Sequence, residues 1–267
     1  MEKKNYKFYF VISDVIKYKQ CKKNHAKQVL ISYFYLRNNE KLLKLLKEDD
    51  DIEIIVDSGL YSFSNSQEID EYESKKYCNE YIEFIKENHA NKNFIGFFEL
   101  DFDLIGYNYH NFVKYYQNIL LGITNKIILI MQKKRTILDL EEMLSKDINT
   151  IAIPFASRVE RKYFDYLYII DIIKRSNKRI HLLGCSTAEY LVSADQSDSS
   201  SWFMTAAFGE QMRITNNMIE THHYSEGEEI STIYEERIDN NVKEYLKFEE
   251  FINNKKNSNN YEIQRLF

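Results

Sequence analysis

The strongest constraint on the fold is an alternation of short apolar runs with longer segments of helical periodicity. The helical segments are Ile69 to Ile85, Phe112 to Leu121, Ile137 to Leu144 and Tyr163 to Ile173. This alternation is typical of βα units around a parallel sheet, and strands covered by helices are apolar on both faces. The apolar runs are Phe8–Ile12, Glu53–Val56, Phe94–Leu100, Lys126–Met131, Thr150–Phe155 and Arg179–Leu183, with a weaker one at Ser193–Ser197.

The length of the chain favours a closed barrel over an open sheet. The chain has 267 residues, and a single (β/α)₈ barrel has roughly 250. A doubly wound open sheet is the alternative, but no GxGxxG follows the first run and no GxxxxGK[ST] occurs. We predict an α/β fold, a single TIM-type barrel domain over 1–267, with a helix at about 240–254 and a polar tail. The eighth strand is expected at Phe203–Phe208 or Met212–Ile219.

Composition excludes several classes of protein. Cys21, Cys78 and Cys185 lie far apart without a CxxC spacing, which argues against a disulfide framework and a cysteine-rich zinc site. The charged start and the absence of an apolar run of roughly 20 residues predict a soluble cytoplasmic protein without a membrane contact. The net charge of −5 lends no support to general affinity for nucleic acids.

Carboxylates and amides recur where the predicted strands end. Active sites of barrel enzymes lie at the carboxyl ends of their strands. Two carboxylates that face one cavity from different strands suit a double displacement at a sugar carbon, and Asp57 and Asp198 fit that role. The strand-end segments are Ser13-Asp14, Asp57-Ser58-Gly59, Glu99-Leu100-Asp101, Gln132, Pro154, Gly184-Cys185-Ser186 and Asp195-Gln196-Ser197-Asp198.

The order of these segments resembles the tRNA-guanine transglycosylase superfamily over roughly residues 8–205. That superfamily has a DSGGFQ-like loop, further strand-end motifs, an LMGVG segment and a DxxD. The ending Asp198-Ser199-Ser200-Ser201-Trp202 and the early Val29-Leu30-Ile31-Ser32-Tyr33 look more like its compact branch, found in phages and DNA-modification islands. The segments that carry the resemblance are Val56 to Phe63, Glu99-Leu100-Asp101, Ile130-Met131-Gln132, Ile180 to Ser186 and Asp195 to Trp202.

The resemblance implies a function and a role for each matching residue. It implies exchange of guanine for a 7-deazaguanine in a nucleic acid, on DNA in the compact branch, without a cofactor. It implies Asp198 as the nucleophile and Asp57 as the general acid and base. Residues implied to contact the substrate base are Asp101, Gln132, Ser58, Gly59, Gly184, Glu99 and Asp195.

The nucleic acid itself requires basic residues near the mouth of the site, because the chain as a whole is acidic. Residues just after strand ends are suitably placed, and Trp202 closes the last motif. The residues assigned to this contact are Lys133, Lys134, Arg135, Arg158 and Trp202.

Departures from the superfamily pattern are specific. The tRNA enzymes carry a CxCxxC…H zinc site after the nucleophile, whereas no cysteine follows Trp202, so no metal is expected. Leu60 and Ser62 replace a glycine and a glutamine of the DSGGFQ loop, and Lys133 replaces the glycine of VQG. Base selectivity is therefore expected to differ.

Other interpretations stay open at this level. The polymer is DNA or tRNA, and a homodimer or a partner protein is equally compatible with the sequence. A glycoside hydrolase barrel would use Glu99 and Asp198 as its carboxylate pair, but Trp202 is the only tryptophan available to stack on a sugar. A non-catalytic, nucleic-acid-binding partner subunit of a transglycosylase is the remaining alternative, although both Asp57 and Asp198 are present.

Overall fold

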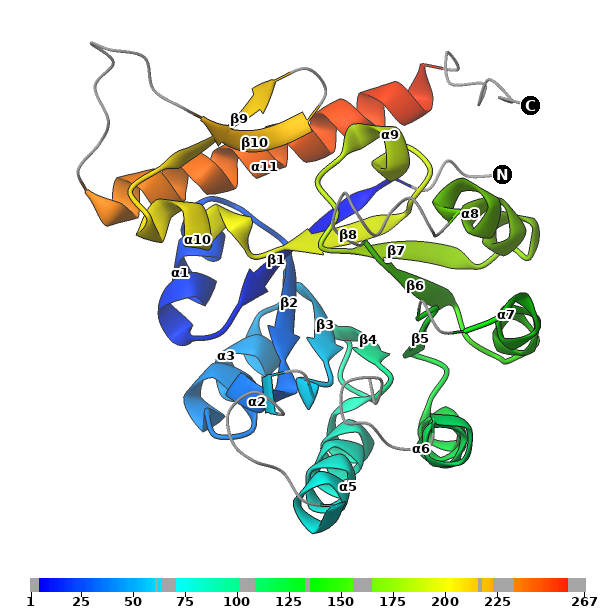
Figure 1. Ribbon diagram of the computed structural model, residues 1–267. Helices are drawn as coiled ribbons and strands as arrows, with labels where there is room; N and C mark the ends of the chain where they lie inside the picture. Colours follow the sequence, from blue (N-terminus) through cyan, green and yellow to red (C-terminus); the bar gives the residue numbers. More distant parts are fainter. Residues whose placement is uncertain are drawn as a thin grey trace.

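Eight parallel strands close into a barrel in sequence order in the computed structural model (Figure 1). The structure describes residues 5–60, 62–63, 71–100, 109–132, 135–155, 165–215, 218–222 and 233–258. The predicted (β/α)₈ barrel is confirmed. The strands are β1 Lys7–Ile12, β2 Gln28–Ser32, β3 Glu53–Asp57, β4 Phe94–Phe98, β5 Ile127–Ile130, β6 Thr150–Pro154, β7 Arg179–Leu183 and β8 Gln196–Ser199.

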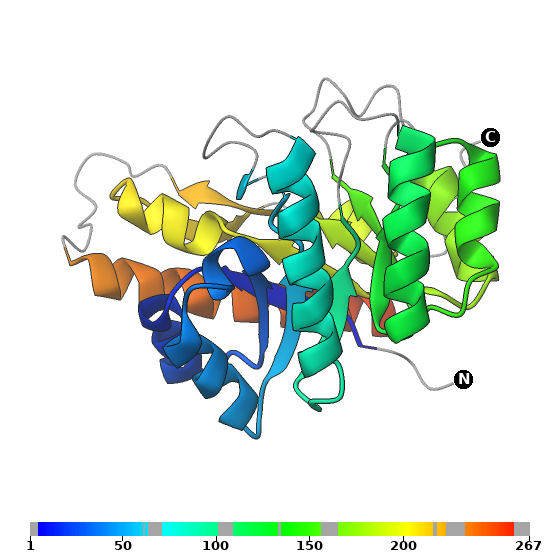
Figure 2. The same ribbon diagram turned by 90° about the horizontal axis from the view of Figure 1, so that it is seen from below.

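Helices surround the strand ring, and the longer ones match the predicted helical segments. Figure 2 shows the cyan helix α5 and the green helices α6 and α7 standing alongside the barrel. The helices are α1 Val15–Lys23, α2 Tyr33–Leu36, α3 Glu40–Glu48, α5 Glu71–Asn88, α6 Tyr109–Ile123, α7 Ile137–Leu144, α8 Tyr166–Arg175, α9 Ala188–Leu191, α10 Ser201–Ala207 and α11 Tyr234–Asn257.

The prediction of the eighth strand was wrong. The strand missing from the predicted set is β2, near the amino terminus, and it pairs with β1 and β3. Residues 203–207 belong to α10. Met212 and Ile219 lie on a separate antiparallel hairpin of β9 Gln211–Thr215 and β10 Met218–His222, outside the barrel. A polar segment of helix α1 separates β1 from β2, which obscured the first βα unit.

Two apolar layers hold the barrel together, because successive side chains of a strand point to opposite faces. On β3, Ile54 and Val56 join the large cluster between sheet and helices, whereas Ile55 joins the smaller cluster inside the barrel. The inner cluster comprises Tyr9, Leu30, Ile55, Phe98, Ile128, Ile130 and Ala152. Burial on both faces explains why these strands appear as continuous apolar runs.

The carboxyl-terminal helix α11 covers the outer face of β1 (Figure 1). Tyr245 of α11 stacks on Phe8 with ring centroids 4.4 Å apart. The carboxylate of Glu249 accepts a hydrogen bond from the Phe8 amide at 3.2 Å. The β9–β10 hairpin packs against α11 and thus belongs to the same layer. Within the described ranges, none of the helices combines the length and apolar character that a bilayer crossing requires.

Candidate functional site

Asp57 and Asp198 lie near the carboxyl ends of β3 and β8. Following the paired residues from strand to strand leads from Asp198 through Tyr9 and Gln28 to Glu53, which is four residues before Asp57. Each step in this direction therefore shifts the paired position toward the amino end of the barrel. A shear of eight residues per turn offsets the three strand steps from β8 to β3 by about three residues. The two aspartates therefore stand at nearly the same height along the barrel.

The carboxylate of Asp198 is held through one of its two oxygens. Its Oδ1 accepts a hydrogen bond from His181 Nε2 at 2.9 Å and another from the Gly184 amide at 3.3 Å. In the part of the chain that the structure describes, no hydrogen bond reaches Oδ2. Asp198 is 8% exposed, so most of the residue is shielded from water. An oriented carboxylate with one uncommitted oxygen has the form that a nucleophile requires.

His181, which sequence reasoning did not assign to the site, is fully buried inside the barrel. Its Nδ1 lies 3.4 Å from Gln196 Oε1, and the Gln196 amide donates to the Tyr9 hydroxyl at 3.5 Å. The Phe98 ring packs edge-on against the imidazole with centroids 5.2 Å apart. A signal for His181 did exist, because Arg179 and His181 are polar at alternate positions of an otherwise apolar strand.

Asp57 is oriented by the loop that follows it. Strand alternation places it on the same inner face of β3 as Ile55. The Gly59 amide donates to Asp57 Oδ2 at 3.0 Å, and the Tyr77 hydroxyl donates to the Ser58 carbonyl at 2.8 Å. Burial, and to a smaller extent the nearby Asp57 charge, raise the pKa of Tyr77. Its hydroxyl therefore stays protonated and keeps this loop in place.

Gly59 and Gly184 shape the two loops that carry the aspartates. Both have positive φ, +72° at Gly59 and +66° at Gly184, a conformation that favours glycine. A Cβ on Gly59 would lie 2.4 Å from Ser32 Oγ and 2.7 Å from the Phe34 amide nitrogen. At Gly184 nothing lies within 4 Å of such a Cβ. Gly59 thus allows close backbone packing, whereas Gly184 borders open space beside Asp198.

Glu99 and Arg135 form a buried ion pair with 2.7 Å between Arg135 Nη1 and Glu99 Oε1. Glu99 also accepts from the Ile130 amide at 2.5 Å and from Gln117 at 2.9 Å. The side chains of Glu99 and Arg135 are only 1% and 5% exposed, respectively. We therefore correct both assignments: Glu99 anchors β4 to β5 and α6 rather than contacting a base, and Arg135 is committed to Glu99 rather than to a phosphate.

Trp202 and Asp195 also differ from their assigned roles. Trp202 is fully buried and donates from its indole N–H to the Val11 carbonyl at 3.1 Å, so it has no free face for a nucleic acid. Asp195 precedes β8 at its amino end and accepts from the Ile180 amide at 2.9 Å. It therefore lies at the end of the barrel away from Asp57. The predicted strand, Ser193–Ser197, began too early and placed Asp195 with Asp198.

The remaining predicted contacts divide into two groups. Gln132 is buried two residues beyond β5, and Ser58 is buried directly after β3, so both stand at the carboxyl end of the barrel. Asp101, Lys133, Lys134 and Arg158 lie outside the described residues. Their assignments stay predictions.

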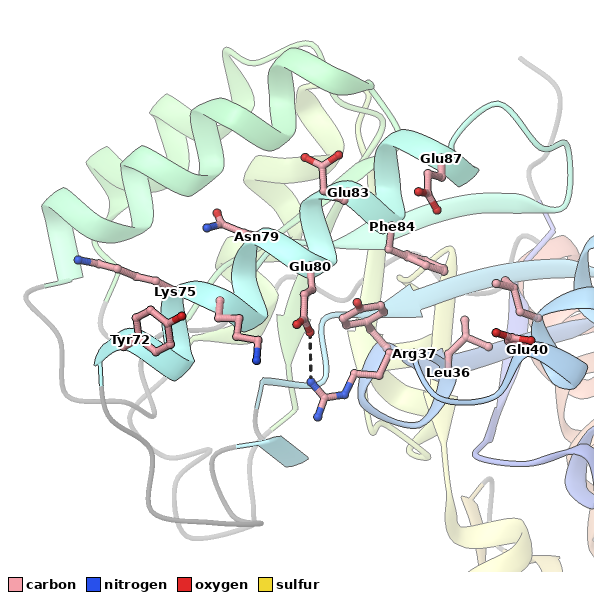
Figure 3. Close-up of a pocket in the computed structure, with 13 residues that line it drawn as sticks. Leu36, Arg37, Glu40, Tyr72, Lys75, Asn79, Glu80, Glu83, Phe84 and Glu87 are labelled. Atoms are coloured by element: carbon pink, nitrogen blue, oxygen red, sulfur yellow. Dashed lines mark hydrogen bonds and ion pairs between the residues drawn. The ribbon is translucent and has the colours of Figure 1, made fainter.

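A groove of about 780 Å³ lies away from the strand ends, on the outer flank formed by α2, α3 and α5. Figure 3 shows Arg37 and Glu80 pointing toward each other in it, with 3.5 Å between their charged groups. None of the predicted site residues lines this groove. A second cavity of about 300 Å³ opens at the amino end, beside Lys7 and Glu53.

The described residues include no group of three histidine, cysteine or carboxylate side chains arranged to hold a metal ion. Cys21, Cys78 and Cys185 are each buried, and none of the three forms a disulfide. Burial raises the pKa of the Cys21 and Cys78 thiols, which disfavours the thiolate form that binds metals.

Comparison with known proteins identifies the fold alone. No protein-family model matches the chain, and no curated protein matches its sequence. A putative fructose-1,6-biphosphate aldolase from Coccidioides immitis superposes with a TM-score of 0.53 at 9% identity, over 95% of this chain and 91% of the aldolase. A point mutant of the tryptophan synthase α-subunit from Pyrococcus furiosus superposes with a TM-score of 0.52 at 11% identity, over 92% of this chain and 100% of that subunit. These likenesses establish the barrel architecture.

Proposed function

We propose that the protein is a guanine transglycosylase that replaces guanine in DNA with a 7-deazaguanine base through a covalent aspartyl intermediate. The observation that supports this most is the hydrogen bonding of Asp198. Its Oδ1 accepts hydrogen bonds from two donors, while Oδ2 accepts no hydrogen bond from the described residues. Asp57 at nearly the same height supplies a second carboxylate. The ordered motifs resembling guanine transglycosylases supply the substrate class.

The proposed reaction is a double displacement at the sugar C1′. Asp198 Oδ2 forms a bond to C1′ while the C1′–N9 bond breaks, and the bonding electrons leave with guanine. Asp57 as a carboxylic acid gives the departing base its proton. Asp57 as a carboxylate then takes a proton from the incoming base, which attacks C1′ and releases Asp198. Each proton and electron pair is accounted for without a cofactor.

The target base must leave the stack before Asp198 can reach C1′, since a base inside a duplex does not expose its glycosidic bond to a buried carboxylate. Gln132 stays in the proposal as a contact to the base, because it is buried at the carboxyl end of the barrel. Contact with the phosphates is left to Lys133, Lys134 and Arg158, since Arg135 is committed to Glu99. We place this activity in the cytoplasm.

The structure weakens the glycoside hydrolase alternative. That mechanism needs Glu99 to donate or accept a proton beside Asp198. Glu99 is held by Arg135, Gln117 and the Ile130 amide and is 1% exposed, so it has no free oxygen for a sugar. A partner subunit without activity and a tRNA-directed enzyme are distinguished by experiment.

Label transfer tests the proposal directly. Purified protein is incubated with radiolabelled guanine and, in separate reactions, with DNA and with tRNA, and Asp198→Asn serves as the inactive control. We expect the wild-type protein to place label in DNA and the variant to place none. Label in tRNA alone would reassign the polymer. Label in neither, with binding of nucleic acid retained, would replace the enzyme with the partner-subunit role.

A further inference from the structure

The least expected feature of the site is the histidine behind Asp198. His181 Nε2 lies 2.9 Å from Asp198 Oδ1, and both groups sit on the inner faces of neighbouring strands β7 and β8. A carboxylate that attacks C1′ must be ionised and then only accepts hydrogen bonds, so the nucleophilic role requires the proton of this pair to lie on Nε2. We propose that His181 is a positioning residue that holds Asp198 through Oδ1 and so directs Oδ2 toward the substrate. This inference rests on the proposed function and deepens it.

Burial makes this hydrogen bond consequential. Asp198 is 8% exposed and His181 is fully buried, so little water competes for this hydrogen bond. A buried carboxylate that loses its hydrogen-bond donor takes up a proton more readily, and a protonated carboxyl is a poor nucleophile. The Gly184 amide at 3.3 Å is the weaker of the two donors by length. His181 is therefore the main group that orients Asp198.

The imidazole is itself held in place, as a positioning group must be. Phe98 packs edge-on against the ring with centroids 5.2 Å apart, and the Tyr9 ring lies tilted beside it with centroids 6.0 Å apart. Gln196 Oε1 lies 3.4 Å from Nδ1 and accepts a hydrogen bond only where Nδ1 also carries a proton. Gln196 is connected through the Tyr9 hydroxyl to Glu53, to which Tyr9 donates at 3.2 Å. A line of polar side chains thus runs inside the barrel from its amino end to Asp198.

The arrangement assigns His181 a different contribution to each half of the exchange. Before attack, it fixes the carboxylate plane so that Oδ2 faces C1′. Once Oδ2 is bonded to C1′, Oδ1 becomes the carbonyl oxygen of the ester and still accepts from Nε2. When the second base displaces the ester, negative charge returns to the carboxylate, and the same donor stabilises it. His181 does not transfer a proton in either step.

Two amide substitutions separate positioning from mere packing. The side-chain nitrogen of His181→Gln reaches the place of Nε2, whereas the shorter side chain of His181→Asn reaches only that of Nδ1. We expect His181→Asn to lower kcat about 100-fold, as for loss of one oriented donor, and to move the acidic limb of the rate profile to higher pH. The KM for free guanine should stay within about twofold, because the donor acts on Asp198 and not on the base. His181→Gln should recover most of the rate, because its amide nitrogen restores a donor at the place of Nε2.

Ser197→Ala is the matched control, because it removes a buried hydrogen bond to the Tyr6 hydroxyl, 2.5 Å long, from the outer face of the same strand. It should leave the rate and its pH profile unchanged. Equal rates and equal profiles for His181→Asn and the wild type would overturn the positioning role. The positioning role would also be overturned if both amide variants lost activity and their residual rates showed the same pH dependence as the wild type.

A spectroscopic measurement on the wild-type protein is independent of activity and of whether the variants fold. Nitrogen-15 NMR of the histidine rings should show a proton on His181 Nε2 that exchanges slowly with water. An unprotonated Nε2 would overturn the inference. Absence of base exchange in a protein with protonated Nε2 would instead contradict the proposed function while leaving the His181–Asp198 pair intact.

Discussion

At the scale of single residues, the two aspartates differ in how the chain holds them. Asp198 is tied through one oxygen to His181 and Gly184, whereas Asp57 is tied to the turn that follows it through the Gly59 amide. The first arrangement favours a fixed nucleophile. The second places a carboxylate at the rim of the barrel, where a group that must exchange protons with a departing and an arriving base is expected.

Asp57→Asn should slow both formation and breakdown of the covalent intermediate, by about 10²- to 10⁴-fold, the range for loss of a general acid and base. Affinity for nucleic acid should be unchanged. Rapid-quench kinetics with labelled guanine measures both steps. Asp51→Asn, which alters a carboxylate 65% exposed just before the same strand, is the control. An effect on one step alone would assign the proton transfer to another group.

Gly59 and Gly184 provide a matched test of backbone geometry. Gly59→Ala should lower the free energy of unfolding by about 3 kcal/mol or more, because left-handed strain combines with overlap against the Phe34 amide. Gly184→Ala should cost about 1 kcal/mol, from the strain alone. Urea denaturation measures both changes. Equal losses would show that the close approach at Gly59 is absent in solution.

At the scale of elements, the sequence allowed most strands to be located but not β2. Seven apolar runs were visible because strands inside a parallel barrel are apolar on both faces. Strand β2 is as long as β3, but it follows helix α1, in which just Tyr18 and Cys21 are buried. Without an apolar stripe on that helix, the first βα unit lacked its signal, and the eighth strand was sought in the β9–β10 hairpin instead.

The packing of α11 on β1 predicts a pH-dependent stability. Burial raises the pKa of Glu249 from 4.5 to about 7, partly opposed by the Phe8 amide and the Lys7 charge. The folded state therefore binds more protons than the unfolded state between these values. The contribution of Glu249 to the free energy of unfolding is fully present below about pH 4.5 and declines as the pH rises to about 7, by about 3 kcal/mol.

Glu249→Gln should remove this decline, since glutamine keeps an acceptor for the Phe8 amide without a charge. The free energy of unfolding of the variant should exceed that of the wild type at about pH 8 but not at about pH 4, on either side of the interval in which the carboxyl titrates. Urea titrations at the two values measure the difference, with the exposed Glu250→Gln as control. An identical pH dependence in the wild type and Glu249→Gln would contradict the burial of this carboxyl.

At the scale of the whole molecule, the alternation of elements was sufficient to predict the barrel, whereas only part of the site followed from sequence. Strand ends located Asp57 and Asp198. Position along the chain does not reveal which way a side chain turns after the strand, so Arg135 and Trp202 were assigned to the surface although both are buried. His181 was overlooked because its importance depends on Asp198 of the neighbouring strand.

The intact protein should contain no stoichiometric zinc. The three cysteines are buried separately, and burial disfavours the thiolate at Cys21 and Cys78. Metal analysis of untagged protein by mass spectrometry should give well below one zinc per chain. One zinc per chain that is lost in Cys185→Ser would reveal a metal site at the end of β7.

The covalent step is tested most directly by mass spectrometry of the protein quenched during turnover with a guanine-containing DNA oligonucleotide. The wild-type protein should gain the mass of the oligonucleotide less one guanine, and peptide mapping should place the adduct on Asp198. Asp198→Asn should gain nothing while keeping its fold and its affinity for guanine, because an amide is a far poorer nucleophile. An adduct on another residue, or label exchange at the wild-type rate by Asp198→Asn, would contradict the assignment of Asp198 as the nucleophile.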